Sequence, residues 1–331
     1  MSDTRFDVVA IGNAIVDVIA RADDAFLESE GLTKGSMRLI DAAEATQLYD
    51  RMGSGQETSG GSAANTVAGI AALGGKASFI GRVANDQLGQ VFKHDIRALG
   101  VSYETPSGPI DPPTARCLIL VTEDAQRTMN TFLGASQNLA SADIEEDIIR
   151  SSAILYLEGY LWDPEVPRAA MRNAIDVARA AGRKVAFTLS DGFCVDRHRG
   201  DFRALIEGGQ IDILFANEDE AMSLTQTDSF EDAANWLEGK AETVVLTRSE
   251  KGATALRGGE RFTISAEPVD EVVDTTGAGD LFAAGVLVGM AQGKSMTESL
   301  TMGAICAAEV ISHYGARPAT DLKELIAQRL G

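Results

Sequence analysis

The chain has 331 residues, a formal net charge of −20 at pH 7 and a sequence pI of about 4.5. Such an acidic chain is a poor match for non-specific nucleic-acid binding, which selects basic surfaces. A hydrophobic content of 45% supports one large α/β domain, alone or with a small appendage.

The cysteines and apolar runs predict a soluble, cytoplasmic protein with no membrane or nucleic-acid partner. Cys117, Cys194 and Cys306 are widely separated, so we expect buried free thiols rather than disulfides or a metal-ligand pair. No basic segment precedes the short apolar run at the N-terminus, unlike in a signal peptide. The long apolar stretch Leu281–Met290 is well short of a membrane span.

Short apolar runs alternate with segments of helical periodicity along most of the chain. We predict buried strands at Val8–Ile11, Ser78–Gly81, Ile154–Leu157, Val185–Leu189, Ile213–Ala216 and Val244–Thr247. The helices predicted between them are Ala63–Leu73, Leu88–Leu99, Pro167–Ala181 and Glu218–Leu224. This alternation favours a parallel sheet covered on both faces, a three-layer α/β fold that binds ligands beyond the carboxyl ends of its strands.

Four further strands interrupt this alternation. We expect them at Asp17–Ala20, Met37–Ile40, Arg116–Val121 and Thr128–Phe132, the last two joined as a hairpin by the linker 122–126. We predict that they form a small β-sheet lid that excludes water from a site, although they would alternatively extend the main sheet. The lid would then comprise 15–50 and 105–135, and the large domain 1–14, 51–104 and 136–331.

A glycine-rich string, Asp-Thr-Thr-Gly-Ala-Gly-Asp at 274–280, leads directly into the long apolar run. A helix that is apolar all round is buried, so its N-terminal N–H groups and positive dipole end form an internal anion site. Gly277, Ala278 and Gly279 leave room for the anion, and Asp280 places a carboxylate beside it. Phosphoryl transfer to a hydroxyl needs this arrangement, whereas a helix cap is the alternative role for Asp280.

Polar residues also follow the first predicted strand. Asn13 and Asp17 interrupt the apolar pattern at its carboxyl end. Their side chains suit hydrogen bonds to vicinal sugar hydroxyls, with ordinary turn chemistry as the alternative.

A second glycine motif precedes the helix predicted at 63–73. Gly60 and Gly61 serve either as a flexible joint or to let a ligand approach the backbone closely. Ser62 is the expected N-cap, and Asn65 would lie on the first helical turn. The side chain of Asn65 would then face the anion site.

Two loops at later strand ends complete the pattern. Asn217 and Glu220 open a helix directly after a strand, where acidic residues are favoured in any case. The loop Thr247–Gly252 follows the next strand. The sequence contains neither a P-loop nor a dinucleotide fingerprint, so phosphate binding must rest on these other loops.

Taken in order, these motifs resemble those of the ribokinase-like carbohydrate and nucleoside kinases, the PfkB family. The string at 274–280 matches the C-terminal signature of that family, and 60–66 resembles the N-terminal one. The segment 81–89 is similar to the family's Gly-x-Val-Gly-x-Asp-x-x-Gly, with Ala84 in place of a glycine. The resemblance covers essentially the whole chain and implies a ribokinase-like fold and ATP-dependent phosphotransfer.

The resemblance also implies roles for the loop residues. Asp280 would take the proton of the acceptor hydroxyl, while the N–H groups of 277–280 hold the developing charge. We expect the helix dipole to keep Asp280 ionised and to lower its basicity. The residues implied in ATP binding are Asn217, Thr247, Gly252, Gly277 and Gly279.

Metal ions are implied in the same way. Glu220 would hold Mg²⁺ through water, matching the family's Asn-x-x-Glu motif. Asp274 and the carbonyl of Thr276 match positions that hold a monovalent cation such as K⁺ in many relatives. An Asx-turn is the alternative for Asp274.

Within the family, the motifs look more like adenosine kinase than ribokinase. We therefore expect the 5′-hydroxyl of a ribonucleoside, adenosine first, as the acceptor. Tyr160 and Phe193 would stack on the purine, Met37 would cover it from the lid, and Arg116 of the lid would clamp a phosphate. The alternatives are a kinase for ribose, fructose or a keto-sugar acid, and a nucleoside-binding protein without catalysis; we expect a monomer or homodimer.

Overall fold

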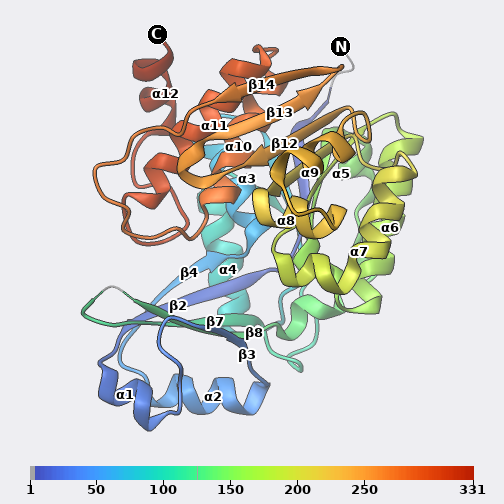
Figure 1. The fold of residues 1–331 in the computed structure, drawn as a ribbon. Helices are drawn as coiled ribbons and strands as arrows, with labels where there is room; N and C mark the ends of the chain where they lie inside the picture. The colour runs from blue at the N-terminus through green and yellow to red at the C-terminus, as the bar shows by residue number, and fades with distance from the viewer. Residues whose placement is uncertain (1–3, 125) are drawn as a thin grey trace.

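The computed structural model describes residues 4–124 and 126–331, and Figure 1 shows a large layered part above a smaller sheet. The large part is built on a nine-stranded sheet in the order β14-β13-β12-β11-β10-β9-β1-β5-β6. Its strands are β1 (Phe6–Ile11), β5 (Ala77–Ile80), β6 (Ser102–Tyr103), β9 (Ser152–Glu158), β10 (Lys184–Thr188), β11 (Ile213–Asn217), β12 (Thr243–Thr247), β13 (Ala253–Arg257) and β14 (Glu260–Ile264).

All six strands predicted for this sheet are present, and the pairs from β12 to β6 are parallel. The strands that the sequence pattern missed lie at the two edges. β13 and β14 continue the sheet in antiparallel sense, and the two-residue β6 ends its other side. The parallel part brings the carboxyl ends of β1, β9, β10, β11 and β12 to one edge, where ligands bind in such sheets.

Helices cover both faces of this sheet, which confirms the three-layer prediction. One face carries α3, α10 and α11, and the other carries α5 to α9 (Figure 1). The helices are α1 (Asp24–Ser29), α2 (Ala42–Arg51), α3 (Ser62–Ala72), α4 (Gln87–Ala98), α5 (Glu146–Arg150), α6 (Glu165–Ala180), α7 (Gly192–Glu207), α8 (Glu218–Thr225), α9 (Phe230–Leu237), α10 (Ala278–Ala291), α11 (Met296–Ile311) and α12 (Leu322–Leu330). None of the helices in the described residues is long and apolar enough to cross a membrane.

The four additional strands do form a separate sheet, together with a fifth. The order is β3-β8-β7-β2-β4, with α2 packed against β7 and β8 on its outer face. The strands are β2 (Ile15–Arg21), β3 (Met37–Leu39), β4 (Gln56–Gly60), β7 (Ala115–Val121) and β8 (Arg127–Phe132). β7 and β8 pair as the predicted hairpin, although Ala125 of its linker lies outside the described residues. β4 differs from the expected boundaries, because it pairs with β2 in the small sheet while the segment 51–104 was assigned to the large domain.

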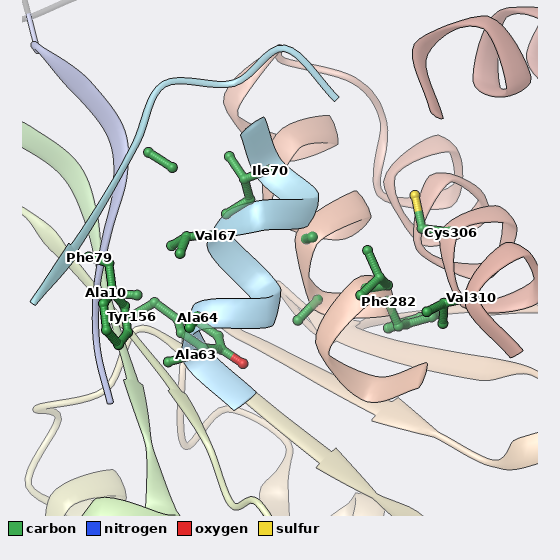
Figure 2. Close-up of a cluster of buried hydrophobic side chains, with 14 of the residues drawn as sticks. Ala10, Ala63, Ala64, Val67, Ile70, Phe79, Tyr156, Phe282, Cys306 and Val310 are labelled. Carbon is green, nitrogen blue, oxygen red and sulfur yellow. The ribbon is translucent and has the colours of Figure 1, made fainter. Parts of the chain in front are cut away.

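The core of the large part holds α3 between the sheet and α10 (Figure 2). Val67 and Ile70 are fully buried in this layer, as are Cys194 and Cys306 elsewhere in the core. All three cysteines are free and buried, as predicted. Gly69 permits the close approach of the two helices, since a Cβ there would lie 2.6 Å from Leu281 Cδ1. This packing fixes the N-terminal ends of α3 and α10 side by side.

Candidate active site

A cleft of about 1320 Å³ lies at the carboxyl ends of the parallel strands, between the large part and the small sheet. The N-termini of α3 and α10 meet near its middle. Sixteen of the residues predicted for the site line it: Asn13, Asp17, Met37, Gly61, Asn65, Tyr160, Phe193, Asn217, Glu220, Thr247, Gly252, Thr276, Gly277, Ala278, Gly279 and Asp280. Gly60, Arg116 and Asp274 do not line it.

Asp280 lies on the first turn of α10 and does not cap that helix. The N-cap is Gly277, whose φ of +80° is a left-handed conformation that glycine adopts without strain. The Asp280 carboxylate instead accepts hydrogen bonds from α3, at 2.6 Å from Ser62 Oγ and 2.9 Å from Asn65 Nδ2. Each oxygen keeps a lone pair for a further donor. The side chain is therefore oriented toward the cleft by a neighbouring helix.

Ser62 is not the N-cap of α3, contrary to expectation. Gly61 takes that position, and Ser62 is the first helical residue. Its hydroxyl donates to Asp280, whereas an N-cap hydroxyl would accept a hydrogen bond from a backbone N–H of its own helix. The sequence contained no sign of this partner, because the two residues are 218 positions apart.

The pKa of Asp280 is raised rather than lowered. Burial is the main cause, because desolvation disfavours the charged carboxylate; hydrogen bonds from Ser62 and Asn65 and the charge of Arg317 oppose it. The expected lowering of basicity by the helix dipole is thus wrong in direction. A carboxylate with a raised pKa is a better proton acceptor for a substrate hydroxyl.

The loop before α10 leaves space for an anion. An added Cβ at Gly279 would meet no protein atom within 4 Å, so the cleft is open directly above this backbone. At Gly277 the situation is the opposite, since a Cβ would lie 2.8 Å from Ala316 Cβ. Gly277 therefore shapes the loop, and Gly279 leaves room for the ligand.

Asn13 is held by the protein itself. Its side-chain amide donates to Glu158 Oε1 at 2.7 Å, and Ser136 Oγ donates to its carbonyl oxygen at 2.8 Å. The residue is 3% exposed, but it lines the cleft and keeps one amide N–H and one carbonyl lone pair for a ligand. Its contact with a sugar stays a prediction.

Glu158, at the end of β9, is a site residue that the sequence reasoning missed. Its fully buried carboxylate accepts bonds from the backbone N–H of Asn13 and of Ala63, at 2.6 and 2.7 Å. Burial raises its pKa to about 7. Glu158 thereby ties β1, β9 and the N-terminus of α3 together beneath the cleft. Its position at a strand's carboxyl end was the one available signal.

Asp17 and Asn65 offer acceptor oxygens that no protein donor in the described part of the chain uses. Asn65 Oδ1 is buried without a hydrogen-bond partner, although its amide nitrogen is bonded to Asp280. The Asp17 carboxylate has no hydrogen-bond donor among the described residues, and burial raises its pKa to about 6 despite Arg317 and Arg127 nearby. Gly60 supports Asp17 indirectly, since a Cβ there would lie 2.3 Å from Asp17 Oδ2. Both acceptor groups suit the hydroxyls of a bound sugar.

Apolar side chains border the same end of the cleft. Met37 of β3 is 51% exposed and Phe193 of α7 is 73% exposed, while Tyr160 is half-buried in the turn after β9. The predicted stacking residues therefore all line this cleft.

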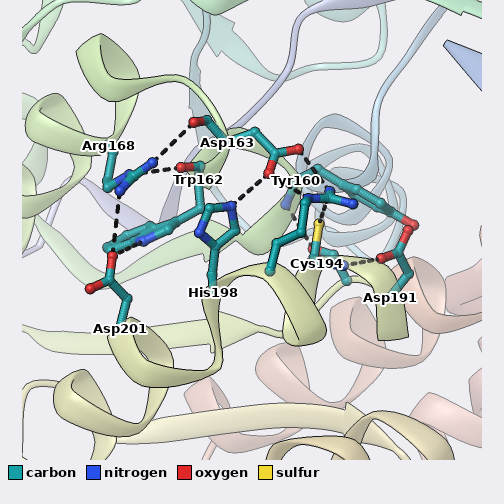
Figure 3. Close-up of polar contacts among 10 residues, drawn as sticks. Tyr160, Trp162, Asp163, Arg168, Asp191, Cys194, His198 and Asp201 are labelled. Atoms are coloured by element: carbon teal, nitrogen blue, oxygen red, sulfur yellow. Dashed lines mark hydrogen bonds and ion pairs between the residues drawn. The ribbon is translucent and has the colours of Figure 1, made fainter.

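A polar network fixes the turn that carries Tyr160 (Figure 3). His198 Nε2 lies 2.6 Å from Asp163 Oδ1, and the Arg197 guanidinium binds the same carboxylate through two hydrogen bonds of 2.8 and 2.7 Å. Asp191 caps α7 by accepting from Cys194 N at 2.6 Å, which sets the start of the helix that bears Phe193. These hydrogen bonds thus hold the two backbone segments that carry Tyr160 and Phe193.

Arg116 lies away from the cleft, and its predicted role as a phosphate clamp is not supported. Successive strand residues point to opposite faces, so Arg116 faces α2 while Cys117 lines the cleft. Arg116 Nη2 donates to Thr46 Oγ1 at 2.8 Å, and its guanidinium lies over the Tyr49 ring. Arg127, at the start of β8, is the small-sheet arginine that contacts the anion loop.

Arg317 is a second cation that the sequence reasoning missed. It donates to the carbonyl oxygens of Ala64 and Ser59 at 2.7 and 2.8 Å, joining α3 to the small sheet. Burial lowers its pKa to about 10, which leaves it charged at neutral pH. Its charge opposes the desolvation of Asp17 and Asp280.

The other end of the cleft has a different lining. Side chains from β12, β14, α11 and the loops beside them line it, the apolar ones including Val245, Ile264, Val272, Ala304, Ala307, Ala308 and Ile311. Asn217 and Glu220 form a capping box at the start of α8, with Asn217 Nδ2 to Glu220 Oε1 at 2.6 Å. Burial raises the pKa of Glu220 to about 7. Thr247 and Gly252 line the cleft on the neighbouring strand end.

The two implied metal ions differ in their fit to these residues. No group of three His, Cys, Asp or Glu side chains in 4–124 and 126–331 is placed to hold a metal ion. Glu220 has lone pairs left beside the cleft, which fits Mg²⁺ held mainly by phosphate and water. The carboxylate of Asp274, in contrast, is occupied by four protein donors, one of them the Arg127 guanidinium. That donor set does not fit a monovalent cation.

The known proteins that are similar to this chain include kinases of sugars and nucleosides. A crystal structure of adenosine kinase from Sinorhizobium meliloti is 49% identical, with a TM-score of 0.91 over 98% of this chain and 99% of that chain. A probable sugar kinase protein from Rhizobium etli is 51% identical, also with a TM-score of 0.91, over 98% of each chain. A 5-dehydro-2-deoxygluconokinase from Shouchella clausii is 26% identical over 98% of this chain and 97% of its own length.

The family model with the description "pfkB family carbohydrate kinase" matches residues 6–322. The match therefore includes both sheets and every loop of the cleft. Together with the carboxylate at the anion loop, it makes the protein an ATP-dependent phosphotransferase for a sugar or nucleoside. The chain belongs to the pfkB family of carbohydrate kinases.

Proposed function

We propose that the protein transfers the γ-phosphoryl group of ATP to the 5′-hydroxyl of adenosine, giving AMP and ADP. The observation that carries this proposal is the composition of the acceptor end of the cleft. Free oxygen acceptors, Asp17 and Asn65 Oδ1, lie beside a border of Tyr160, Phe193 and Met37. A ribonucleoside offers hydroxyls to the first group and a flat apolar base to the second.

Asp280 then acts on the primary hydroxyl. Asp17 and Asn65 accept hydrogen bonds from the two secondary hydroxyls, which leaves the 5′-oxygen nearest to Asp280. Asp280 takes its proton as the oxygen attacks the γ-phosphorus and the bond to the β-phosphate oxygen breaks. The open backbone at 277–279 holds the charge that develops on the phosphoryl oxygens. Mg²⁺, when bound near Glu220, supplies charge neutralisation for the phosphates.

The name of the Sinorhizobium meliloti relative supports adenosine, while that of the Shouchella clausii relative points to a keto-sugar acid. A sugar acid needs a cation for its carboxylate. The arginines bordering the acceptor end, Arg38 and Arg197, already pair with Glu44 and Asp163. We therefore rank the sugar acid second.

The test compares acceptors on one enzyme preparation. Initial ATP consumption is measured with adenosine, ribose, fructose and 5-dehydro-2-deoxygluconate, and kcat/KM is determined for each. We expect the highest value for adenosine. A higher value for any of the sugars would overturn the nucleoside assignment and leave the kinase assignment in place.

Phe193→Ala sharpens this test. Loss of an aromatic contact of about 0.5–1.5 kcal/mol should lower kcat/KM for adenosine roughly two- to tenfold. The value for ribose, which has no base, is the internal control and should not change. An equal fall for both acceptors would mean that Phe193 supports the fold rather than the base.

A further inference from the structure

Asp274 lies directly behind the anion loop and is nearly closed off from solvent. Its Oδ1 accepts from Thr276 N at 3.1 Å and from Thr276 Oγ1 at 2.8 Å. Its Oδ2 accepts from Gly315 N at 2.9 Å and binds Arg127 Nη1 at 2.7 Å. Asp274 therefore holds the start of the loop through both of its oxygens.

Arg127 contacts the loop at two points. The same Nη1 donates to Thr276 Oγ1 at 2.9 Å, so one guanidinium nitrogen is shared between Thr276 and Asp274. The side chains of Arg127 and Asp274 are only 9% and 4% exposed. The guanidinium also lies over the Tyr314 ring, with its central carbon 5.7 Å from the ring centroid. A charge pair this buried is weakly screened by water or salt.

The two partners belong to different parts of the molecule. Arg127 begins β8 of the small sheet, whereas Asp274 and Thr276 precede α10 of the large part. The pair is formed only where the small sheet lies against the anion loop. The position of the small sheet and the order of the loop are consequently linked through one side chain.

A monovalent cation at Asp274 would have to share Oδ2 with this guanidinium. Two like charges at that spacing repel each other strongly in a buried site. The guanidinium already supplies a full positive charge, and it adds hydrogen bonds of fixed direction. The Arg127 guanidinium therefore balances the charge of Asp274 without a bound ion.

We propose that Arg127 replaces the monovalent cation of related kinases and orders the anion loop when the small sheet covers the cleft. Arg127 is thus a positioning residue that acts through Asp274 and Thr276. The proposal rests on the phosphotransferase activity and is independent of which acceptor is used. It predicts that the wild-type enzyme does not need K⁺.

The first experiment uses the unmodified enzyme. ATP turnover is measured in potassium chloride and in tetramethylammonium chloride at equal ionic strength, and thermal unfolding is followed in both salts without acceptor. We expect rates that agree within about twofold and equal melting temperatures, because the charge at Asp274 is already neutralised. Activation by K⁺ of about tenfold or more would overturn the proposal, since it would require a bound cation.

The second experiment compares two arginines of the same sheet. Arg127→Met removes the charge but keeps an apolar side chain of similar length, and Arg116→Met makes the same change on the face away from the cleft. In tetramethylammonium, Arg127→Met should lose at least about tenfold in kcat, as expected when a transition-state loop is misplaced. Potassium should restore part of this rate and raise the melting temperature. Arg116→Met should behave as the wild type in both salts.

The melting temperature separates this proposal from the choice of acceptor, because it is measured without one. If K⁺ changed neither the rate nor the melting temperature of Arg127→Met, the proposal that the guanidinium takes the place of a cation would be overturned. Should Arg127→Met fail to fold, the comparison of the two salts on the wild type still decides the matter.

Discussion

The two ends of the cleft are built on opposite principles. The acceptor end places Asp17, Glu158 and Asp280 in a largely desolvated space, with Arg317 as a buried counter-charge. The other end, which we assign to the nucleotide, includes several apolar side chains from α11, such as Ala307. We therefore expect directional hydrogen bonds to select the acceptor, and shape and apolar contact to contribute more to nucleotide binding.

The acceptor end carries three carboxyl groups with raised pKa values and the nucleotide end carries one, which affects how each responds to pH. Burial raises the pKa values of Asp17, Glu158 and Asp280 above those of free carboxyl groups. Acceptor binding and proton transfer therefore respond to pH in a range where free carboxylates no longer titrate. At the nucleotide end, Glu220 is the corresponding raised carboxyl group, and its partner is Asn217 of the same helix cap.

The largest effect is expected for Asp280→Asn. The asparagine keeps its bonds, because the Ser62 hydroxyl can turn to accept from the new amide while Asn65 still donates to the carbonyl oxygen. Loss of the proton acceptor should lower kcat on the order of 10² to 10⁴. ATP binding, measured by titration calorimetry, and the melting temperature should be nearly unchanged.

The same variant tests whether the acceptor end serves proton transfer as well as binding. If Asp280→Asn retained more than about a third of wild-type kcat, proton transfer to this group would not limit the reaction. The acceptor end would then serve binding alone.

A smaller effect is expected for Asp17→Ala. Hydroxyls left without this acceptor should cost about 1–3 kcal/mol, which raises the KM for the acceptor roughly 5- to 150-fold. The KM for ATP should change little, because Asp17 borders only the acceptor end. Equal increases in both values would show that the two ends are not separate.

Asp17 also predicts a pH profile. Its pKa of about 6 lies above that of a free carboxyl group, so the group gains a proton and loses its charge as the pH falls through 6. The wild-type kcat/KM for the acceptor should therefore fall below about pH 6, and this limb should be weaker in Asp17→Ala. A profile that is identical in both enzymes would assign the limb to another group.

The smallest effect is expected at the nucleotide end. Ala307→Val adds two methyl groups to the apolar lining, and overpacking of about 1 kcal/mol should raise the KM for ATP about fivefold. The KM for the acceptor is the internal control and should stay constant. A larger change in the acceptor KM than in the ATP KM would reverse the assignment of the two ends.

The sequence was most informative where the site is contiguous. The string at 274–280 predicted an anion loop, a buried helix and a carboxylate together, because backbone conformation and helix polarity are local properties. The alternation of strands and helices predicted the layered sheet for the same reason. Both antiparallel edge strands were missed; β14 has an exposed, polar pattern that resembles a loop, whereas β13 is buried along most of its length.

Residues that act across long chain separations could not be predicted. Glu158 bonds to Asn13 over 145 positions, and Arg317 bonds to Ser59 over 258. Arg116 was predicted for the site and Arg127 was missed, because a strand's pattern does not show which face meets the cleft. A shift of one residue moves a side chain to the opposite face, as Arg116 and Cys117 illustrate.

The packing of α3 against α10 also sets an order on biosynthesis. The ribosome makes α3 early, yet the face of α3 at Gly69 acquires its cover only when Leu281 and Ala284 of α10 have emerged. The nascent chain consequently carries an uncovered apolar layer through most of its translation, a situation that favours protection by chaperones. The helix that closes the core also carries Asp280, so a chain that ends before this residue lacks the carboxylate that we propose as the proton acceptor.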